Sequence, residues 1–284
     1  RISASNYLAQ IQMTKMPLDG HSQAKALLAR AEEINLANAK KTAVILVNLG
    51  TPDEPSAPAI KRYLAEFLSD PRVVTLPRAV WLPILHGAIL NVRPRKLVQK
   101  YKMIWGTHDG PIRNITAALA LRVHEQLTRE DPDRQIKVTS AMTYGNPSIT
   151  SVLNQLCDQG CNDFLFIPLF PQYSSATTGA VFDQVTRALC QRTTPLHRFL
   201  DQYHQHTAYI HALTKSVEAY NRQINEGAFL LFSFHGIPES YQSVGRHSRV
   251  IGMPTIFVGF HDLEPFPQIA NETGTDCHVN SIPG

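Results

Sequence analysis

Short apolar runs alternate with longer segments that have one apolar face, and this alternation limits the folds open to the chain. The first run, residues 43–49, is apolar at all but one position and is followed by the turn-forming residues Gly50, Thr51 and Pro52. Apolar residues with helical spacing come next, at Ile60, Leu64, Phe67 and Leu68. The order strand, tight turn, helix is the beginning of a βαβ unit. The sequence therefore predicts an α/β fold whose first strand covers residues 43–49.

The same alternation continues along most of the chain. It predicts strands over 136–144, 163–169, 230–234 and 254–260, and helices over 111–129, 148–159, 207–224 and from Ala180 onward, with Ser148 as an N-cap. We therefore expect a mostly parallel, doubly wound α/β architecture. A chain of 284 residues is long enough for two domains. We expect an N-terminal extension over 1–41, a first domain over 42–200 and a second, shortened domain over 201–284.

A histidine follows the apolar run at 230–234. We expect this run to be a buried strand of a parallel sheet, because it is apolar at nearly every position. The run ends at His235, and Gly236 and Pro238 then stop the strand. Carboxyl ends of strands face the ligand crevice of an open α/β sheet, so His235 is a candidate site residue. A histidine that caps the strand or binds a loop is the structural alternative.

Residues 80–92 are apolar nearly all round and are too short to span a bilayer, which takes about 20 residues. One interpretation is a buried helix. The other is an apolar lip around a hydrophobic ligand, in contact with a membrane surface. Arg93, Arg95 and Lys96 follow at once. They can pair with the carboxylates of an amphipathic ligand or form a solvated helix start.

Hydroxyl groups gather between the strand at 163–169 and the helix that begins at Ala180. Hydroxyls and free N–H groups at a helix start form an anion site, whereas ordinary Ser/Thr capping is the alternative. The turn at Gly50 lacks the further glycines of a nucleotide-binding loop. The formal net charge of +4 comes without a dense Lys/Arg block, which argues against nucleic acid as a partner. The four cysteines form no metal-type pair, so we expect free thiols and a reduced, cytoplasmic protein.

Five short motifs, in this order, resemble those of the ferrochelatase family. Ferrochelatases are lyases that insert Fe²⁺ into protoporphyrin IX to form protohaem in the last step of haem synthesis. The resemblance runs from about Thr42 to Gly245 and implies two Rossmann-like, chelatase-type domains with mostly parallel sheets, the second one incomplete. The porphyrin would be clamped between the two domains. The motifs are VNLGTP at 47–52, FLSD at 67–70, PLFPQYS at 168–174, TTG at 177–179 and SFHGIP at 233–238.

The same resemblance implies roles for individual residues. His235 matches the family's metal-site histidine, which binds the incoming iron or accepts pyrrole protons. The expected porphyrin contacts are Leu49, on the face of the macrocycle, with Arg93, Tyr101, Tyr173 and Ser174. Residues 80–92 match the lip through which porphyrin enters near the membrane. This implies a cytoplasmic protein that is peripheral to the inner face of the membrane.

The sequence also departs from the family pattern. Gly110 stands where the family has a serine, so one hydroxyl on the porphyrin side is lost. Ser175 replaces a cysteine found in some members, and no cysteine cluster follows, so an iron–sulfur cluster is not expected.

The departure with the largest chemical consequence lies after His235. The family's Trp-Leu-x-Pro-x-x-x-Glu motif, whose glutamate is the second metal and proton residue, has no match there; Asp262 and Glu264 are the nearby carboxylates. The tail after Gly245 is open to interpretation as native, internally deleted or frameshifted. Two functions therefore stay open. One is a ferrochelatase that acts through His235, and the other is a catalytically impaired relative that binds porphyrin or haem. A defective fragment with an incomplete second sheet is a third interpretation.

Overall fold

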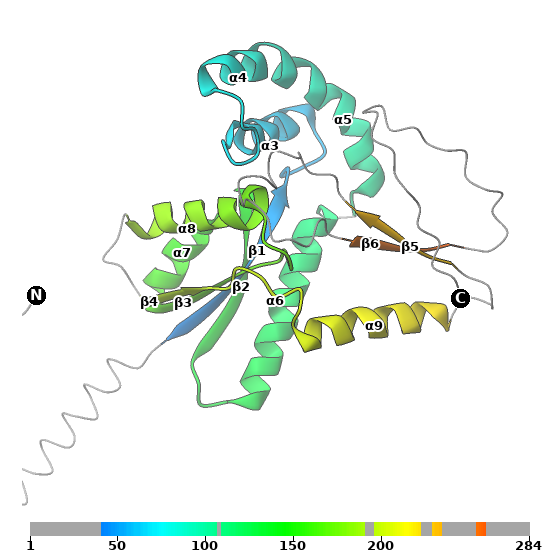
Figure 1. Ribbon diagram of the computed structural model, residues 1–284. Helices are drawn as coiled ribbons and strands as arrows, with labels where there is room; N and C mark the ends of the chain where they lie inside the picture. Colours follow the sequence, from blue (N-terminus) through cyan, green and yellow to red (C-terminus); the bar gives the residue numbers. More distant parts are fainter. Residues whose placement is uncertain (1–40, 107–108, 191–195, 223–228, 235–253, 260–284) are drawn as a thin grey trace, which may run out of the picture.

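Four parallel strands form the central sheet of the protein (Figure 1). The computed structural model describes residues 41–106, 109–190, 196–222, 229–234 and 254–259. The strands are β1 (Thr42–Thr51), β2 (Ile136–Gly145), β3 (Asp163–Pro168) and β4 (Leu196–Phe199). Their order in the sheet is β2-β1-β3-β4, so β1 lies inside it.

Helices cover both faces of this sheet (Figure 1). On one face lies α6 (Pro111–Glu130), whose Ala120 packs with Val44 and Leu46 of β1. On the other face lie α7 (Ile149–Asp158) and α8 (Ala180–Cys190), which pack against the alternate residues Ala43, Ile45 and Val47. Because successive side chains of a strand point to opposite faces, a strand covered on both faces needs consecutive apolar residues, as β1 has at 43–47.

A further helical layer lies beyond the carboxyl ends of the strands (Figure 1). The layer consists of α3 (Ala57–Ser69), α4 (Arg78–Ile84), a π-helical segment η1 (Leu85–Ile89) and α5 (Leu90–Ile104). Its buried residues form what we call the α3–α5 cluster: Ile60, Tyr63, Leu64, Leu85 and Leu90, joined by Tyr144 of β2 and Ala180 of α8. This cluster fixes the layer to the sheet.

Residues 80–92 are not a buried helix. Leu85 and Leu90 are buried in the α3–α5 cluster, but the side chains of Val80, Ile84 and Val92 are 55%, 45% and 54% exposed. The segment is therefore anchored by two leucines and presents its other apolar residues to the outside. Among the described residues, no helix is long and apolar enough to cross a membrane.

Several predicted elements are confirmed. Strands β1, β2 and β3 and helices α6 and α7 lie within one or two residues of their predicted bounds, and α3 contains Ile60, Leu64, Phe67 and Leu68 as predicted. The Ser148 hydroxyl caps α7 by accepting a 3.2 Å hydrogen bond from the Ser151 N–H. Strand β4 was not predicted, since it is a short edge strand whose side chains are mostly exposed and whose sequence has no apolar run.

One predicted pairing is wrong. Strand β5 (Phe229–Phe234) was expected in a parallel sheet, but it pairs antiparallel with β6 (Pro254–Gly259) in a separate two-stranded sheet. Antiparallel pairs are slightly more stable per residue than parallel ones, which favours this arrangement when two strands pair alone. Helix α9 (Thr207–Asn221) precedes β5, as predicted. The N-terminal extension lies outside the described residues, and the boundary between the two domains stays a prediction.

Candidate functional site

The carboxyl ends of β1 and β2 lie in close contact, and Gly50 makes this contact possible. Gly50 has a φ of 115°, and a Cβ atom built on it would lie 1.8 Å from the carbonyl oxygen of Tyr144. No other residue type fits there without a shift of the backbone. Beside it, the Thr143 hydroxyl donates a 3.0 Å hydrogen bond to the carbonyl of Asn48. The glycine of the VNLGTP motif is therefore required by the close approach of the two strands.

Asn48 ties the end of β1 to α6. Its amide nitrogen donates a 2.9 Å hydrogen bond to the Thr116 hydroxyl, which in turn donates to the carbonyl of Ile112 at 2.6 Å. Its side-chain oxygen accepts from the N–H of Leu49 at 2.8 Å. These bonds orient the backbone at Leu49, the residue expected to contact the face of the macrocycle.

Leu49 and Tyr101 pack against the same group of residues. Leu49 is partly buried and contacts both the core under α7 and α8 and the α3–α5 cluster. Tyr101 of α5 packs against the α3–α5 cluster as well, with its ring edge-on to that of Trp105 at a centroid distance of 6.2 Å. Burial raises the pKa of Tyr101, while the positive charge of Arg93 opposes that rise. The fold thus gathers Leu49 and Tyr101 near the carboxyl end of β1 and places Arg93 within electrostatic reach of Tyr101.

A buried tyrosine joins the end of β2 to the end of α3. The Tyr144 hydroxyl donates a 2.8 Å hydrogen bond to Oδ2 of Asp70, and the N–H of Arg72 donates to Oδ1 at 2.8 Å. The ring of Phe67 meets the Tyr144 ring edge-on at 5.2 Å. Burial, reinforced by the negative charge of Asp70, raises the pKa of Tyr144 well above its usual range. Tyr144 is therefore a neutral hydrogen-bond donor at physiological pH.

Arg72 forms a bidentate ion pair with Asp183. Its Nε and Nη2 donate to the two carboxylate oxygens of Asp183, at 2.5 and 2.7 Å. Its Nη1 donates to the Ser175 hydroxyl at 3.1 Å. The hydrogen bond from Asp183 is the main reason that the pKa of Arg72 is raised. Arg72 therefore connects the segment after α3 to the start of α8.

Tyr173 and Ser174 come directly before η2 (Ser175–Gly179), a π-helical turn that leads into α8. The carbonyl of Ser174 accepts hydrogen bonds from the N–H groups of Thr177 at 3.2 Å and of Gly179 at 3.0 Å. A Cβ atom on Gly179 would lie 3.3 Å from the Tyr173 hydroxyl, which places this hydroxyl over the turn. The same loop is fixed to β1, because the N–H of Leu169 donates to the carbonyl of Val47 at 2.7 Å.

The loop before α8 has two interpretations, as an anion site or as ordinary Ser/Thr capping of the helix. The Ser174 side chain makes no capping hydrogen bond, so simple capping does not describe it. Asp183 already places a carboxylate in the first turn of α8, where negative charge is favourable, and this carboxylate is paired with Arg72. The start of α8 is therefore already supplied with a negative charge from the chain itself.

Gly110, which stands where the family has a serine, is packed tightly. A Cβ atom at this position would lie 3.2 Å from the Thr51 hydroxyl and from the Trp105 ring. A side chain at position 110 would therefore require the neighbouring ring and hydroxyl to shift by a few tenths of an ångström.

The predicted metal residue His235 lies outside the described residues, as do Asp262 and Glu264. Within the described ranges, no group of three His, Cys, Asp or Glu side chains is placed to hold a metal ion. Cys157, Cys161 and Cys190 are free thiols, as expected. Burial raises the pKa of the Cys161 thiol.

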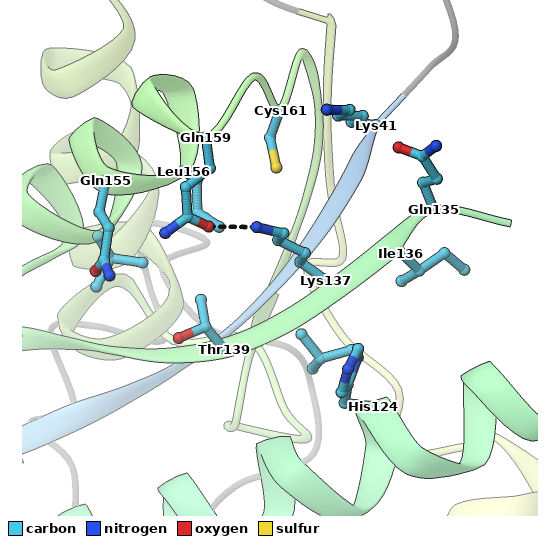
Figure 2. A pocket seen from close by; sticks show the side chains of 12 residues that line it. Lys41, His124, Gln135, Ile136, Lys137, Thr139, Gln155, Leu156, Gln159 and Cys161 are labelled. Atoms are coloured by element: carbon cyan, nitrogen blue, oxygen red, sulfur yellow. Dashed lines mark hydrogen bonds between the residues drawn. The ribbon is translucent and has the colours of Figure 1, made fainter.

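A pocket of about 520 Å³ lies at the opposite, amino end of the strands (Figure 2). Its lining includes His124 of α6 and Cys161, and Lys137 of β2 donates across it to the Gln159 side chain at 2.5 Å. None of the predicted porphyrin contacts lines this pocket. The candidate site is therefore the carboxyl edge, where Leu49, Tyr101, Tyr173 and Ser174 lie on elements packed against one another.

Sequence reasoning missed Asp70, Arg72 and Asp183, which organise this edge. Asp70 belongs to the FLSD motif, and a hydrogen-bonding role could have been inferred from its place at the end of a helix. No local pattern links Arg72 to Asp183, which are 111 residues apart.

Comparison with known proteins identifies close relatives. The family model described as Ferrochelatase matches residues 41–271. The chain is 46% identical to the ferrochelatase of Methylibium petroleiphilum over 208 residues, or 73% of this chain and 57% of that relative. It is 46% identical to that of a Polaromonas species over 72% of this chain and 55% of the relative. It is 42% identical to that of a Psychrobacter species over 73% of this chain and 61% of the relative. The chain thus spans little more than half the length of these curated relatives.

Proposed function

The chain belongs to the ferrochelatase family, and from this we propose that it binds protoporphyrin IX at the carboxyl ends of β1 to β3 and inserts Fe²⁺. The observation that carries the proposal is the position of Leu49. It is partly buried between two hydrophobic groups and shares the α3–α5 cluster with Tyr101. The Tyr173–Ser174 loop is bonded to the same strand end through Leu169. An apolar surface with a few polar groups at its edge suits a flat, largely apolar macrocycle.

The chemistry assigns a role to His235. A porphyrin loses two pyrrole protons as the metal enters, so the reaction needs a base near the macrocycle, and neutral imidazole is suited to that task at physiological pH. Imidazole is also a suitable ligand for iron. His235 directly follows β5 in the sequence and matches the family's metal-site histidine. We assign it as proton acceptor and ligand of the incoming Fe²⁺, which is a substrate.

Positively charged side chains on α5 complement the propionate groups of the porphyrin. Arg93 and Arg95 are exposed on this helix, and guanidinium groups bind carboxylates with two parallel hydrogen bonds. In this proposal they bind the propionates of the porphyrin while Leu49 and Tyr101 contact the macrocycle.

The exposed apolar residues of α4 to α5 suit a peripheral contact with an anionic membrane. Val80, Ile84 and Val92 are exposed there, next to Leu76 at 52% exposure. Between Pro71 and Gly106 the sequence has no Asp or Glu. Basic residues attract such a segment to anionic lipid while apolar side chains enter the interface. The proposal therefore includes a location at the inner, cytoplasmic face of a membrane. The basic residues on α4 and α5 are Arg78, Arg93, Arg95, Lys96, Lys100 and Lys102.

A second candidate function is porphyrin or haem binding without turnover. It is favoured by the absence, after His235, of a match to the family's glutamate motif. The two functions share the binding step and differ in metal insertion.

Quenching of protein and porphyrin fluorescence on titration with protoporphyrin IX tests the binding step. We expect Leu49→Ala and Tyr173→Ala each to weaken affinity about tenfold, which corresponds to about 1.4 kcal/mol. Leu196→Ala, on the exposed edge strand β4, is the matched control and should leave affinity unchanged. Equal affinities for all four proteins would place the porphyrin elsewhere.

A further inference from the structure

The side chain of Arg72 lies against the turn that follows Tyr173 and Ser174. Its guanidinium bonds Ser175 and Asp183, which are 103 and 111 residues away in the sequence. We propose that Arg72 is a positioning residue for the porphyrin-contacting loop, and this inference rests on the function proposed above. Arg72 would act through Ser175 and Gly179, without contact to the porphyrin.

Arg72 contacts η2 at both of its ends. At the first residue, Nη1 donates a 3.1 Å hydrogen bond to the buried Ser175 hydroxyl. At the last residue, a Cβ atom on Gly179 would lie 2.8 Å from the same Nη1. The guanidinium therefore packs directly on the backbone of the turn. Since the carbonyl of Ser174 accepts from Thr177 and Gly179, holding both ends of η2 also holds the Ser174 peptide.

The Tyr173 hydroxyl depends on the same packing. A Cβ atom on Gly179 would lie 3.3 Å from this hydroxyl, so Arg72 and Tyr173 approach the same glycine. Loss of the guanidinium would open space beside Gly179 and allow the Tyr173 side chain to move. The position of the Tyr173 hydroxyl beside Gly179 is therefore set in part by Arg72.

Arg72 and its partner are themselves held in place. The Arg72 N–H donates to Asp70, which also accepts from the Tyr144 hydroxyl at the end of β2. Asp183 lies on α8, and the next residue, Gln184, donates a 2.7 Å hydrogen bond to the carbonyl of Thr143. Both halves of the ion pair are thus connected to β2, which makes the pair a rigid link between that strand and the loop.

The geometry requires arginine in particular. Nε and Nη2 bind both oxygens of Asp183 while Nη1 remains directed at Ser175, and the planar guanidinium makes these bonds at once. A lysine keeps the charge but offers a single nitrogen. The side chains of Arg72 and Asp183 are 31% and 39% exposed, so the attraction between their charges is by itself weak. The fixed geometry of the guanidinium hydrogen bonds, more than the charge, is what holds the turn in position.

The test compares Arg72→Met and Arg72→Lys with the parent chain. Arg62→Met, which removes an exposed ion pair to Asp53 at 3.4 Å, is the matched control. Hydrogen exchange of the Thr177 and Gly179 amides reports the turn, with the Val152 amide of α7 as an internal reference. Titration with protoporphyrin IX measures the porphyrin affinity of each protein.

In Arg72→Met, we expect exchange at Thr177 and Gly179 to be about tenfold faster, with no change at Val152, and porphyrin affinity to be about tenfold weaker. The exchange rates and the porphyrin affinity of Arg72→Lys should lie between those of Arg72→Met and the parent chain. Arg62→Met should have the same exchange rates and affinity as the parent chain. Unchanged exchange at Thr177 and Gly179 in Arg72→Met would overturn the positioning role. Faster exchange with unchanged porphyrin affinity would support that role and count against the proposed porphyrin contacts of Tyr173 and Ser174.

Discussion

The hydroxyl of Tyr144 donates a 2.8 Å hydrogen bond to Oδ2 of Asp70, which joins the end of β2 to the end of α3. Tyr144 is almost completely buried, and Asp70 also binds the N–H of Arg72. This one contact therefore connects the sheet, the helical layer beyond it and the arginine that bonds the Ser175 hydroxyl. Through Asp70, the position of Arg72 in the candidate site therefore depends on the packing of Tyr144 in the core.

Tyr144→Phe removes that hydrogen bond and leaves the ring in place. We expect a loss of about 2 kcal/mol in the free energy of unfolding, since the acceptor is a carboxylate that loses a buried donor. Urea unfolding followed by circular dichroism measures it. Tyr209→Phe, on α9, is the control and should change stability by less than about 0.5 kcal/mol. Equal effects of the two substitutions would contradict a special role for the Tyr144 hydroxyl.

Substitution by alanine should lower the stability of the protein at Gly50 and raise it at Gly87. At Gly50 the added Cβ would meet the Tyr144 carbonyl at 1.8 Å, with φ at 115°, so Gly50→Ala should cost about 3 kcal/mol or more, or prevent folding. Gly87 lies in a helical segment and has nothing within 4 Å of a Cβ, so Gly87→Ala should raise stability by about 0.5–1 kcal/mol. Thermal unfolding of both variants checks this pair, and a stable Gly50→Ala protein would contradict the close approach of β1 and β2.

Stability should fall at alkaline pH. Burial raises the pKa of Tyr203 from its ordinary value of 10 to about 12. The unfolded chain therefore loses this proton first, and the stabilising contribution of the neutral phenol is complete below pH 10 and is lost as the pH rises toward 12. Urea midpoints measured from pH 8 to 12 should show this decline. Tyr203→Phe should make it shallower, and an identical pH profile for the variant would contradict the predicted burial effect.

If residues of α4 to α5 contact a membrane, substitutions there should weaken binding to lipid vesicles without lowering the stability of the protein. Replacing Val80, Ile84 and Val92 together by serine should change the free energy of unfolding by less than about 1 kcal/mol, because these side chains are already exposed. It should weaken binding to vesicles that contain anionic lipid about tenfold. Added salt should weaken the binding of the parent chain, because the Debye length falls from about 10 Å at 0.1 M to about 3 Å at 1 M. Vesicle sedimentation measures both effects, and unchanged binding of the triple variant would contradict the contact.

The fold was predictable where local sequence and tertiary environment agree. Residues 43–47 form a continuous apolar run, which matches the cover that α6 and α7–α8 give to both faces of β1. Ser148 was recognisable as a cap because its hydroxyl acts within the same turn. Strand β4 carries no such signal, since its side chains are exposed and the strand is held by pairing with β3.

The candidate site was predictable only in part, because its members come from distant segments. The resemblance identified Leu49 and Tyr101, which the fold brings to the same cluster. Arg72 and Asp183 carry no motif of their own, and their contact follows from the placement of α8 beside the segment after α3. The η2 turn was expected as a loop opening a regular helix, since nothing in its sequence distinguishes a π-helical turn. The role of His235 stays a prediction.

Metal insertion by the purified chain tests the proposed function. Conversion of protoporphyrin IX and Fe²⁺ to haem is followed by the loss of porphyrin fluorescence and the appearance of the haem absorbance spectrum. His235→Ala is compared with His211→Ala, an exposed histidine of α9. We expect insertion by the parent chain and by His211→Ala, and none by His235→Ala, with porphyrin binding retained in all three proteins. Tight porphyrin binding by the parent chain without any metal insertion would contradict the enzyme and leave the porphyrin-binding relative as the function.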